Sequence, residues 1–198
     1  MLKFSKSLAI GLISLGASVA HAEGLSYNYI EIALQDEEHY DQPSKGVSFA
    51  GSFAPIEYVF FQAEFTGRVT DDEYPSGSGG ETDVVLESIR SLRAGVRLPV
   101  TSLNDVVATA EKVDSTIELG DMELDYDYEI YRLGTRALLW PTVELNTYIV
   151  HVKYDGADDA TGSEVGARWN FAGESSMGIE FTDVEEQKII KVSFRYSF

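Results

Sequence analysis

The sequence contains no cysteine, three histidines, and 15 basic residues against 33 acidic ones. The absence of cysteine excludes disulfide bonds, Cys-ligated zinc and thiol catalysis, and the shortage of histidine argues against a His-rich metal centre. A formal net charge of -18 is opposite in sign to what phosphate contacts require, which excludes nucleic acid as a partner. We therefore expect neither a metal nor another cofactor.

Long hydrophobic runs are also scarce, apart from one at the N-terminus. There, a basic start and a mostly apolar run end at Ala20-His21-Ala22, the small-x-small pattern of a signal peptidase site. A membrane anchor, the alternative, needs about 20 apolar residues, and this run stops sooner, at Glu23. The sequence predicts a cleaved signal peptide over residues 1–22 and a single domain over residues 23–198.

The rest of the chain consists of segments in which apolar and polar residues alternate with a period of two, the pattern of β-strands. The connections between these segments alternate between short and long. The long connections, over residues 35–44, 70–83 and 114–127, are acidic. Merging weak neighbours would leave eight strands. We predict ten, over Leu25–Leu34, Lys45–Ala54, Glu57–Val69, a fourth ending at Leu98, Asp105–Val113, Tyr128–Leu139, Glu144–Tyr154, Ser163–Phe171, Ser176–Thr182 and Gln187–Phe198.

Each strand has an apolar face and a polar face. On the strand over 144–154, we assign Tyr148, Val150 and Val152 to the apolar face, and His151 and Lys153 to the polar one. A soluble barrel would place the apolar faces inside and a membrane barrel would place them outside, so alternation alone fits both. The residues predicted on the charged face are Glu31, Glu64, Arg68, Arg93, Arg97, Glu111, Arg132, Arg136, Lys153, Arg168, Glu180, Lys191 and Arg195.

Three features favour the membrane barrel, in which the charged face lines the lumen. Aromatic residues, among them Tyr27, Tyr29, Tyr154 and Trp169, fall near segment ends, where interfacial girdles would lie. The alternation of short and long connections is typical of periplasmic turns and external loops. The chain also ends in a strand of alternating hydrophobic residues that closes on the aromatic Phe198.

With the signal peptide, the terminal segment Lys191-Val192-Ser193-Phe194-Arg195-Tyr196-Ser197-Phe198 resembles the small outer-membrane β-barrel proteins of Gram-negative bacteria, whether OmpA- and OmpX-like or porin-like. The resemblance implies an all-β, antiparallel up-and-down transmembrane β-barrel in the cell outer membrane, in contact with lipid and lipopolysaccharide. It also implies an assembly signal that the barrel assembly machinery reads, formed by Ile190, Val192, Phe194, Tyr196 and Phe198. We favour a monomer.

The charged face also bears on function. Its basic residues outnumber its glutamates, which predicts a positive surplus in the lumen. We expect a structural or surface-interaction role with acidic loops facing outward. The alternative is a narrow passive pore that favours anions. A third possibility is a lipid-modifying enzyme that uses a lumen His151 as a base, but no nucleophile or carboxylate pairs with it by spacing, so we expect no enzyme.

Overall fold

The computed structural model describes residues 25–39, 42–72, 83–119, 122–140 and 142–198, so the predicted signal peptide lies outside the described residues. The described chain is made of β-strands, and it holds no helix long and apolar enough to cross a membrane. The strands are β1 (Tyr29–His39), β2 (Gln42–Ile56), β3 (Val59–Asp72), β4 (Asp83–Thr101), β5 (Asn104–Leu119), β6 (Met122–Trp140), β7 (Val143–Tyr154), β8 (Ala160–Ala172), β9 (Ser175–Val184) and β10 (Gln187–Ser197).

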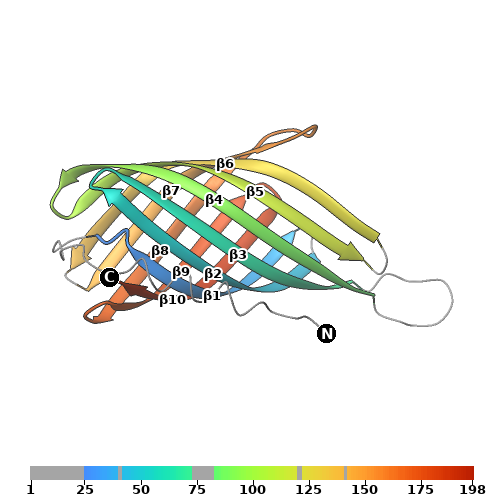
Figure 1. Cartoon of the computed structure of the whole chain (residues 1–198), viewed down its shortest axis with the longest axis horizontal. Helices are drawn as coiled ribbons and strands as arrows, with labels where there is room; N and C mark the ends of the chain where they lie inside the picture. Colours follow the sequence, from blue (N-terminus) through green and yellow to red (C-terminus); the bar gives the residue numbers. More distant parts are fainter. Residues whose placement is uncertain (1–24, 40–41, 73–82, 120–121, 141) are drawn as a thin grey trace.

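These ten strands form one closed barrel (Figure 1). Every strand pairs antiparallel with its neighbours in the sequence, and β1 closes the barrel by pairing with β10 from Tyr29 opposite Ser197 to His39 opposite Gln187. Closure pairs both edges of every strand over the height that the ten strands share. The predicted up-and-down antiparallel barrel of ten strands is confirmed, and the eight-strand alternative is wrong.

Two of the acidic segments predicted as loops are paired strands. The β1–β2 pairing continues to His39 opposite Gln42, and the β5–β6 pairing continues to Leu119 opposite Met122. The extended pairing satisfies the main-chain hydrogen bonds between the paired strands, and most of their acidic side chains are exposed, whereas Glu37 is buried. The period-two alternation of Ile117 and Leu124 with charged neighbours was therefore a strand signal that the acidic composition concealed.

The barrel has two unlike ends. At the first, which we call the terminal end, β1 begins, β10 ends, and the β2–β3, β4–β5, β6–β7 and β8–β9 connections lie. At the second, the hairpin end, the paired strands β3 to β6 extend beyond the rest of the wall, on the right in Figure 1. The extension on this side gives the barrel one tall wall and one short wall.

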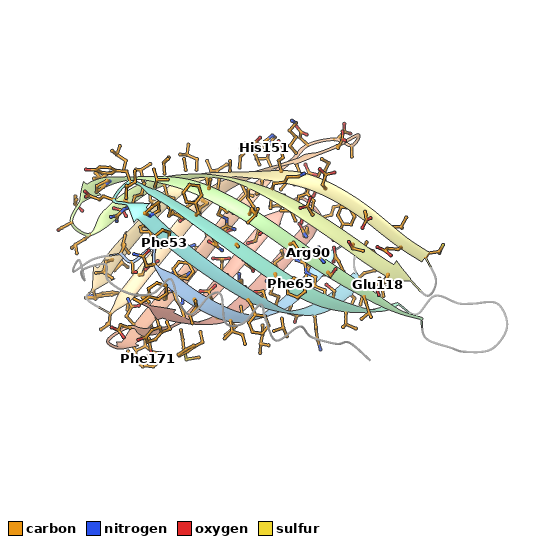
Figure 2. The ribbon with its side chains drawn as sticks, viewed as in Figure 1. Phe53, Phe65, Arg90, Glu118, His151 and Phe171 are labelled. Carbon is orange, nitrogen blue, oxygen red and sulfur yellow. The ribbon has the colours of Figure 1, made fainter. Side chains whose placement is uncertain are left out.

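The outward face is apolar over most of the barrel height, and the outward side chains in Figure 2 include Phe53, Phe65 and Phe171. At the terminal end, the exposed Trp140, Trp169 and Phe171 form an aromatic belt. Toward the hairpin end the outward face becomes charged. Its outward residues there include Arg90, Lys112, Asp114, Glu118, Asp127, Glu129 and Lys153.

The predicted aromatic girdles are therefore correct at one end only. Trp169 lies outward as expected, but Tyr27 and Tyr29 lie inside the barrel, with exposed fractions of 5% and 6%. Tyr154 points inward as well and packs against Tyr128, with ring centroids 5.6 Å apart. Each of these three tyrosines shares its parity with inward-facing neighbours, and the period-two geometry overrides the preference of aromatic residues for an interface.

Inward-facing glycines allow large rings to lie against the lumen wall. A Cβ on Gly95 would come within 2.2 Å of the Phe60 ring, and a Cβ on Gly134 would come within 2.6 Å of the Tyr148 ring. Both rings are buried. Side chains at these two positions would push the rings toward the barrel axis, so the glycines let aromatic side chains fill the lumen without strain.

Candidate functional site in the barrel lumen

The lumen collects charges of both signs. Twelve of the thirteen residues predicted on the charged face point inward, the exception being Lys153. Among the described residues, the inward basic side chains are Arg68, Arg93, Arg97, Arg132, Arg136, Arg168, Lys191 and Arg195, and the inward acidic ones are Glu31, Glu37, Glu64, Glu87, Asp105, Glu111, Glu144, Glu164 and Glu180.

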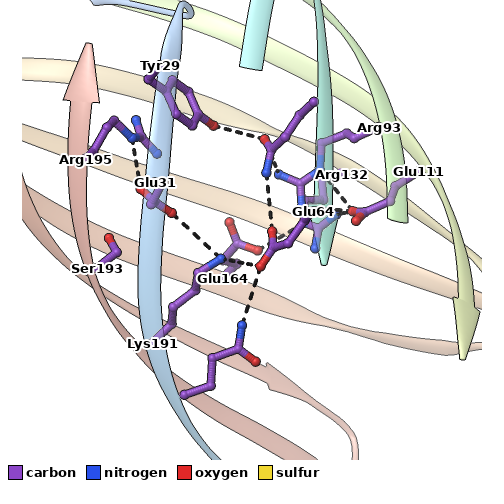
Figure 3. Close-up of polar contacts among 12 residues, drawn as sticks. Tyr29, Glu31, Glu64, Arg93, Glu111, Arg132, Glu164, Lys191, Ser193 and Arg195 are labelled. Atoms are coloured by element: carbon purple, nitrogen blue, oxygen red, sulfur yellow. Dashed lines mark hydrogen bonds and ion pairs between the residues drawn. The ribbon is translucent and has the colours of Figure 1, made fainter. Parts of the chain in front are cut away.

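Glu31 on β1 is the centre of the first cluster (Figure 3). Its Oε2 atom accepts hydrogen bonds from Arg168 Nη2 at 2.6 Å and from Arg195 Nε at 2.9 Å. Lys191 Nζ lies 3.8 Å from the Oε1 atom of the same carboxylate. The cluster connects β1, β8 and β10. Because Arg195 is directly opposite Glu31 in the β1–β10 register, this ion pair also stabilises the seam that closes the barrel.

Glu64 on β3 carries the network across the lumen. Its Oε1 atom lies 2.8 Å from Lys191 Nζ, and its Oε2 atom accepts a hydrogen bond from Gln62 Nε2 at 3.4 Å. Gln62 Oε1 in turn accepts from the Tyr29 hydroxyl at 3.0 Å and from Arg93 Nη1 at 3.4 Å. Figure 3 shows this chain of contacts reaching from β10 and β1 to β4.

Glu111 on β5 joins two arginines on the far side of the lumen. Its Oε2 atom accepts from Arg93 Nε at 2.9 Å and from Arg132 Nη1 at 2.5 Å. Arg132 Nε also donates to Glu164 Oε2 on β8 at 3.0 Å. These four side chains have exposed fractions below 20%. The contacts from Glu31 to Glu164 form a continuous polar bridge across the barrel, which we call the lumen bridge.

The terminal end is closed by residues that precede β1. The Tyr27 hydroxyl donates to Asp105 Oδ2 at 3.0 Å, and the Tyr27 ring lies under the guanidinium groups of Arg136 and Arg97, at 4.2 and 4.9 Å. Arg136 is itself paired with Glu144 at 2.8 Å. Cation–π contacts and hydrogen bonds therefore hold Tyr27 as a plug inside the barrel mouth.

A second ion-pair cluster lies toward the hairpin end. Arg68 Nη1 lies 2.7 Å from Glu37 and 3.4 Å from Glu87. Glu87 also accepts hydrogen bonds from Ser115, at 2.7 Å, and from the Tyr126 hydroxyl. Each charge in this cluster has a partner, so the outer part of the lumen is occupied as well.

Little space remains between these clusters. A cavity of about 120 Å³ lies on the hairpin side of the lumen bridge, and a cavity of about 70 Å³ lies on the terminal side. The two cavities share four lining residues, Arg93, Arg132, Glu164 and Glu180. Three of these belong to the lumen bridge, so the bridge separates the two cavities. A wider vestibule of about 1000 Å³ opens only beyond Tyr27, at the terminal end. The lumen therefore holds small separate cavities rather than an open channel.

Lys153 and His151 correct the face assignment on β7. Lys153 lies on the outer surface 3.6 Å from Glu129, and His151 lies outward with its Nε2 atom 3.5 Å from Asp159 and its Nδ1 atom 3.2 Å from the Thr161 hydroxyl. Neither enters the lumen. The inward face of β7 is instead the apolar set Tyr148, Val150 and Val152, which packs inside the barrel with Ala160 and Val184.

The signal that identifies the inward face of β7 lies at its other end. Glu144 and Asn146 share the parity of Tyr148, and in the structure Glu144 is buried against Arg136. A glutamate and an asparagine on the same face of a strand indicate the lumen face of a membrane barrel, whereas Leu145, Thr147 and Ile149 on the other face carry no charge. Tyr148, Val150 and Val152 make the lumen face apolar in the second half of the strand, and this conceals the polar signal.

The predicted positive surplus is also wrong. The inward basic side chains are matched by acidic residues outside the set predicted on the charged face: Glu37, Glu87, Asp105, Glu144 and Glu164. Glu37 lies in a segment predicted as a loop, Asp105 is the first residue of a predicted strand, and Glu144 is predicted on the wrong face of β7. The described lumen is close to charge balance, so it does not carry the cationic lining that anion selectivity requires.

No protein-family model and no curated protein matches this sequence. Solved structures do. A KdgM porin in complex with disordered oligogalacturonate matches with a TM-score of 0.52 at 10% identity, covering 86% of this chain and 99% of that chain. The structural neighbours of this chain are outer-membrane β-barrel proteins. One is the β domain of the Bordetella autotransporter BrkA, which matches with a TM-score of 0.49 at 11% identity over 86% of this chain and 98% of that chain. Another is the CymD monoaromatic hydrocarbon channel, which matches with a TM-score of 0.44 at 8% identity over 88% of this chain and 89% of that chain. At these identities the likeness concerns the fold.

Proposed function

We propose that this protein is an integral outer-membrane β-barrel with a closed lumen, which acts through the surface at its hairpin end rather than by transport. The lumen bridge is the observation that carries this proposal. Its ion pairs join strands on opposite sides of the barrel, and the cavities on either side of it measure about 120 and 70 Å³. A hydrated ion passing along the axis would have to displace several paired charges, which is costly in a low-dielectric environment.

The outward face supports the membrane location. Large apolar side chains are exposed over much of this face, for example Leu92 at 69% and Ile149 at 65%, and soluble proteins rarely expose apolar patches of this extent. The aromatic belt at the terminal end and the charged outward residues toward the hairpin end border this apolar surface, as the two interfaces of a bilayer require. In this orientation the hairpin end faces outward from the cell and the chain termini face the periplasm.

Planar-bilayer recordings test the closed lumen. We expect no steady conductance for the wild-type barrel. The double variant Glu111→Ser with Arg132→Ser, which removes one acid and one base of the lumen bridge without changing the net charge, is expected to show conductance steps because the two cavities then merge. Steady, ion-selective conductance of the wild type would contradict the proposal and favour a narrow pore.

We further propose that β10 is the assembly signal. Val192, Phe194 and Tyr196 lie on the outward face, and Phe198 donates its main-chain N–H to Asn28 O at 3.0 Å. Deleting Phe198 is expected to reduce the amount of inserted protein in cells severalfold, while the purified barrel refolds in detergent with little loss of stability, since one hydrogen bond contributes about 1 kcal/mol. Phe198→Tyr is the matched control, because it keeps a terminal aromatic. Equal insertion of the deletion variant and wild type in cells would refute the assembly role.

A further inference from the structure

Part of β6 has a free edge at the hairpin end of the barrel. β6 pairs with β5 from Ala137 opposite Asn104 down to Met122 opposite Leu119, but its pairing with β7 begins only at Tyr128 opposite Tyr154. The segment Met122–Asp127 therefore has no partner on its β7 side among the described residues. It belongs to the tall wall that extends past the other strands in Figure 1.

The register tells which main-chain groups point to this free edge. The Leu138 N–H donates to Leu103 O at 2.7 Å, and the β5–β6 register continues without a shift from Asn104–Ala137 to Leu119–Met122. In an antiparallel pair, alternate residues direct both main-chain groups to the same neighbour. Even-numbered residues of β6 thus bond to β5, and Glu123, Asp125 and Asp127 direct their N–H and C=O groups to the free edge.

The two faces beside this edge differ in chemistry. The outward face is acidic: Glu123 lies opposite Glu118, and Asp127 lies opposite Asp114. Lys112 lies at the base of this ladder, 3.5 Å from Asp114 and 3.4 Å from Asp127. The inner face is apolar and open. Met122, Leu124 and Tyr126 have exposed fractions of 61%, 62% and 40%.

We propose that the segment Met122–Asp127 is a docking edge for an extended segment of a partner protein in which Lys or Arg alternates with apolar residues. A strand added at this edge would satisfy the free main-chain groups. Because side chains alternate between faces, its basic residues would lie beside Glu123, Asp125 and Asp127 while its apolar residues cover Leu124. A second copy of β6 would bring acid opposite acid, which disfavours self-association. The inference rests on the proposed surface role.

Peptide binding to the intact barrel in detergent micelles tests the proposal. The probe is a fluorescently labelled peptide of alternating Lys and Val, and its control has the same composition with Lys and Val in separate blocks. Fluorescence anisotropy should show tighter binding of the alternating peptide. Only this peptide presents basic and apolar side chains on opposite faces of a strand.

Two substitutions separate strand addition from charge attraction. Asp125→Ala and Asp125→Pro both remove the carboxylate, but only proline removes the N–H that points to the free edge. An edge strand tolerates proline on its solvent side, and heat-modifiable gel mobility verifies that each variant folds. The proline variant should bind the alternating peptide about fivefold more weakly than the alanine variant, since it lacks one further hydrogen bond.

Each outcome decides the question. Equal affinity for the two peptides, or equal loss in the two variants, would show mere charge attraction and overturn the docking edge. Self-association in light scattering that Asp125→Pro abolishes would assign the edge to a second copy, which also overturns the proposal. Bilayer recordings on the same sample separate this result from the proposed function: a conducting wild type contradicts the closed lumen whether or not the peptide binds.

Discussion

Replacing Glu111 by glutamine is expected to lower the free energy of unfolding by about 3 kcal/mol or more. The neutral amide leaves the guanidinium groups of Arg93 and Arg132, which now share one carboxylate oxygen at 2.9 and 2.5 Å, without their common counter-ion. Breaking a buried ion pair from one side is costly because the remaining charge stays buried. Urea titration of the barrel in lipid vesicles, followed by tryptophan fluorescence, measures this change.

Glu180→Gln is the matched control for that substitution. Glu180 lines the same two cavities and lies opposite Lys191 in the β9–β10 register, but Lys191 Nζ contacts Glu64 and Glu31 instead. Glu180 has no ion pair within contact distance among the described residues, so we expect its neutral variant to change stability by less than about 1 kcal/mol. Equal losses of unfolding free energy for the two variants would contradict the conclusion that the ion pairs of Glu111 stabilise the barrel.

Replacing Ile149 by arginine is expected to cost about 2–4 kcal/mol of stability in lipid vesicles. Ile149 lies outward on β7 and directly opposite the outward Leu133 of β6, with exposed fractions of 65% and 58%. Both side chains lie within the apolar surface that we assign to the bilayer, where a guanidinium group would lose its hydration. Leu133→Arg should therefore give a loss of the same size.

Leu86→Arg is the control for this experiment. Leu86 is also exposed and outward, but it lies in the tall wall opposite Glu118 in the β4–β5 register, beyond the apolar surface. Arginine there meets water and a carboxylate, so we expect a change between about 0 and 1 kcal/mol. A loss at Leu86 as large as that at Ile149 would contradict the assigned position of the bilayer.

The face of β7 shows why sequence reasoning failed at one strand and succeeded elsewhere. On β3, Phe61 and Phe65 alternate with Gln62 and Glu64, and a single parity separates the two chemistries over the whole strand. On β7 both faces contain apolar residues, so composition alone does not show which face points into the lumen. Contacts with Arg136 on β6 and with Val184 on β9, which no local pattern contains, decide the orientation.

Among the ion pairs, those between neighbouring strands follow from the sequence pattern, whereas those across the lumen depend on the tertiary structure. Arg93 and Glu111 both lie on the charged face that alternation predicts, and the structure brings them together directly across the β4–β5 ladder. The contact of Lys191 with Glu64 joins residues far apart in the sequence. It depends on barrel closure, on the register of several strands and on how far a long side chain reaches across the lumen, none of which alternation encodes.

The sequence by itself determined the fold class, the number of strands and most of the inward charges. Period-two alternation is a local property that marks each strand and its two faces, and a series of antiparallel strands removes its unpaired edges by closing into a barrel. Tertiary structure alone decided that the lumen charges balance, that Tyr27 plugs the terminal end and that part of β6 keeps a free edge. These features depend on strand register and on the unequal heights of neighbouring strands, which are set by the summed contacts of the whole barrel.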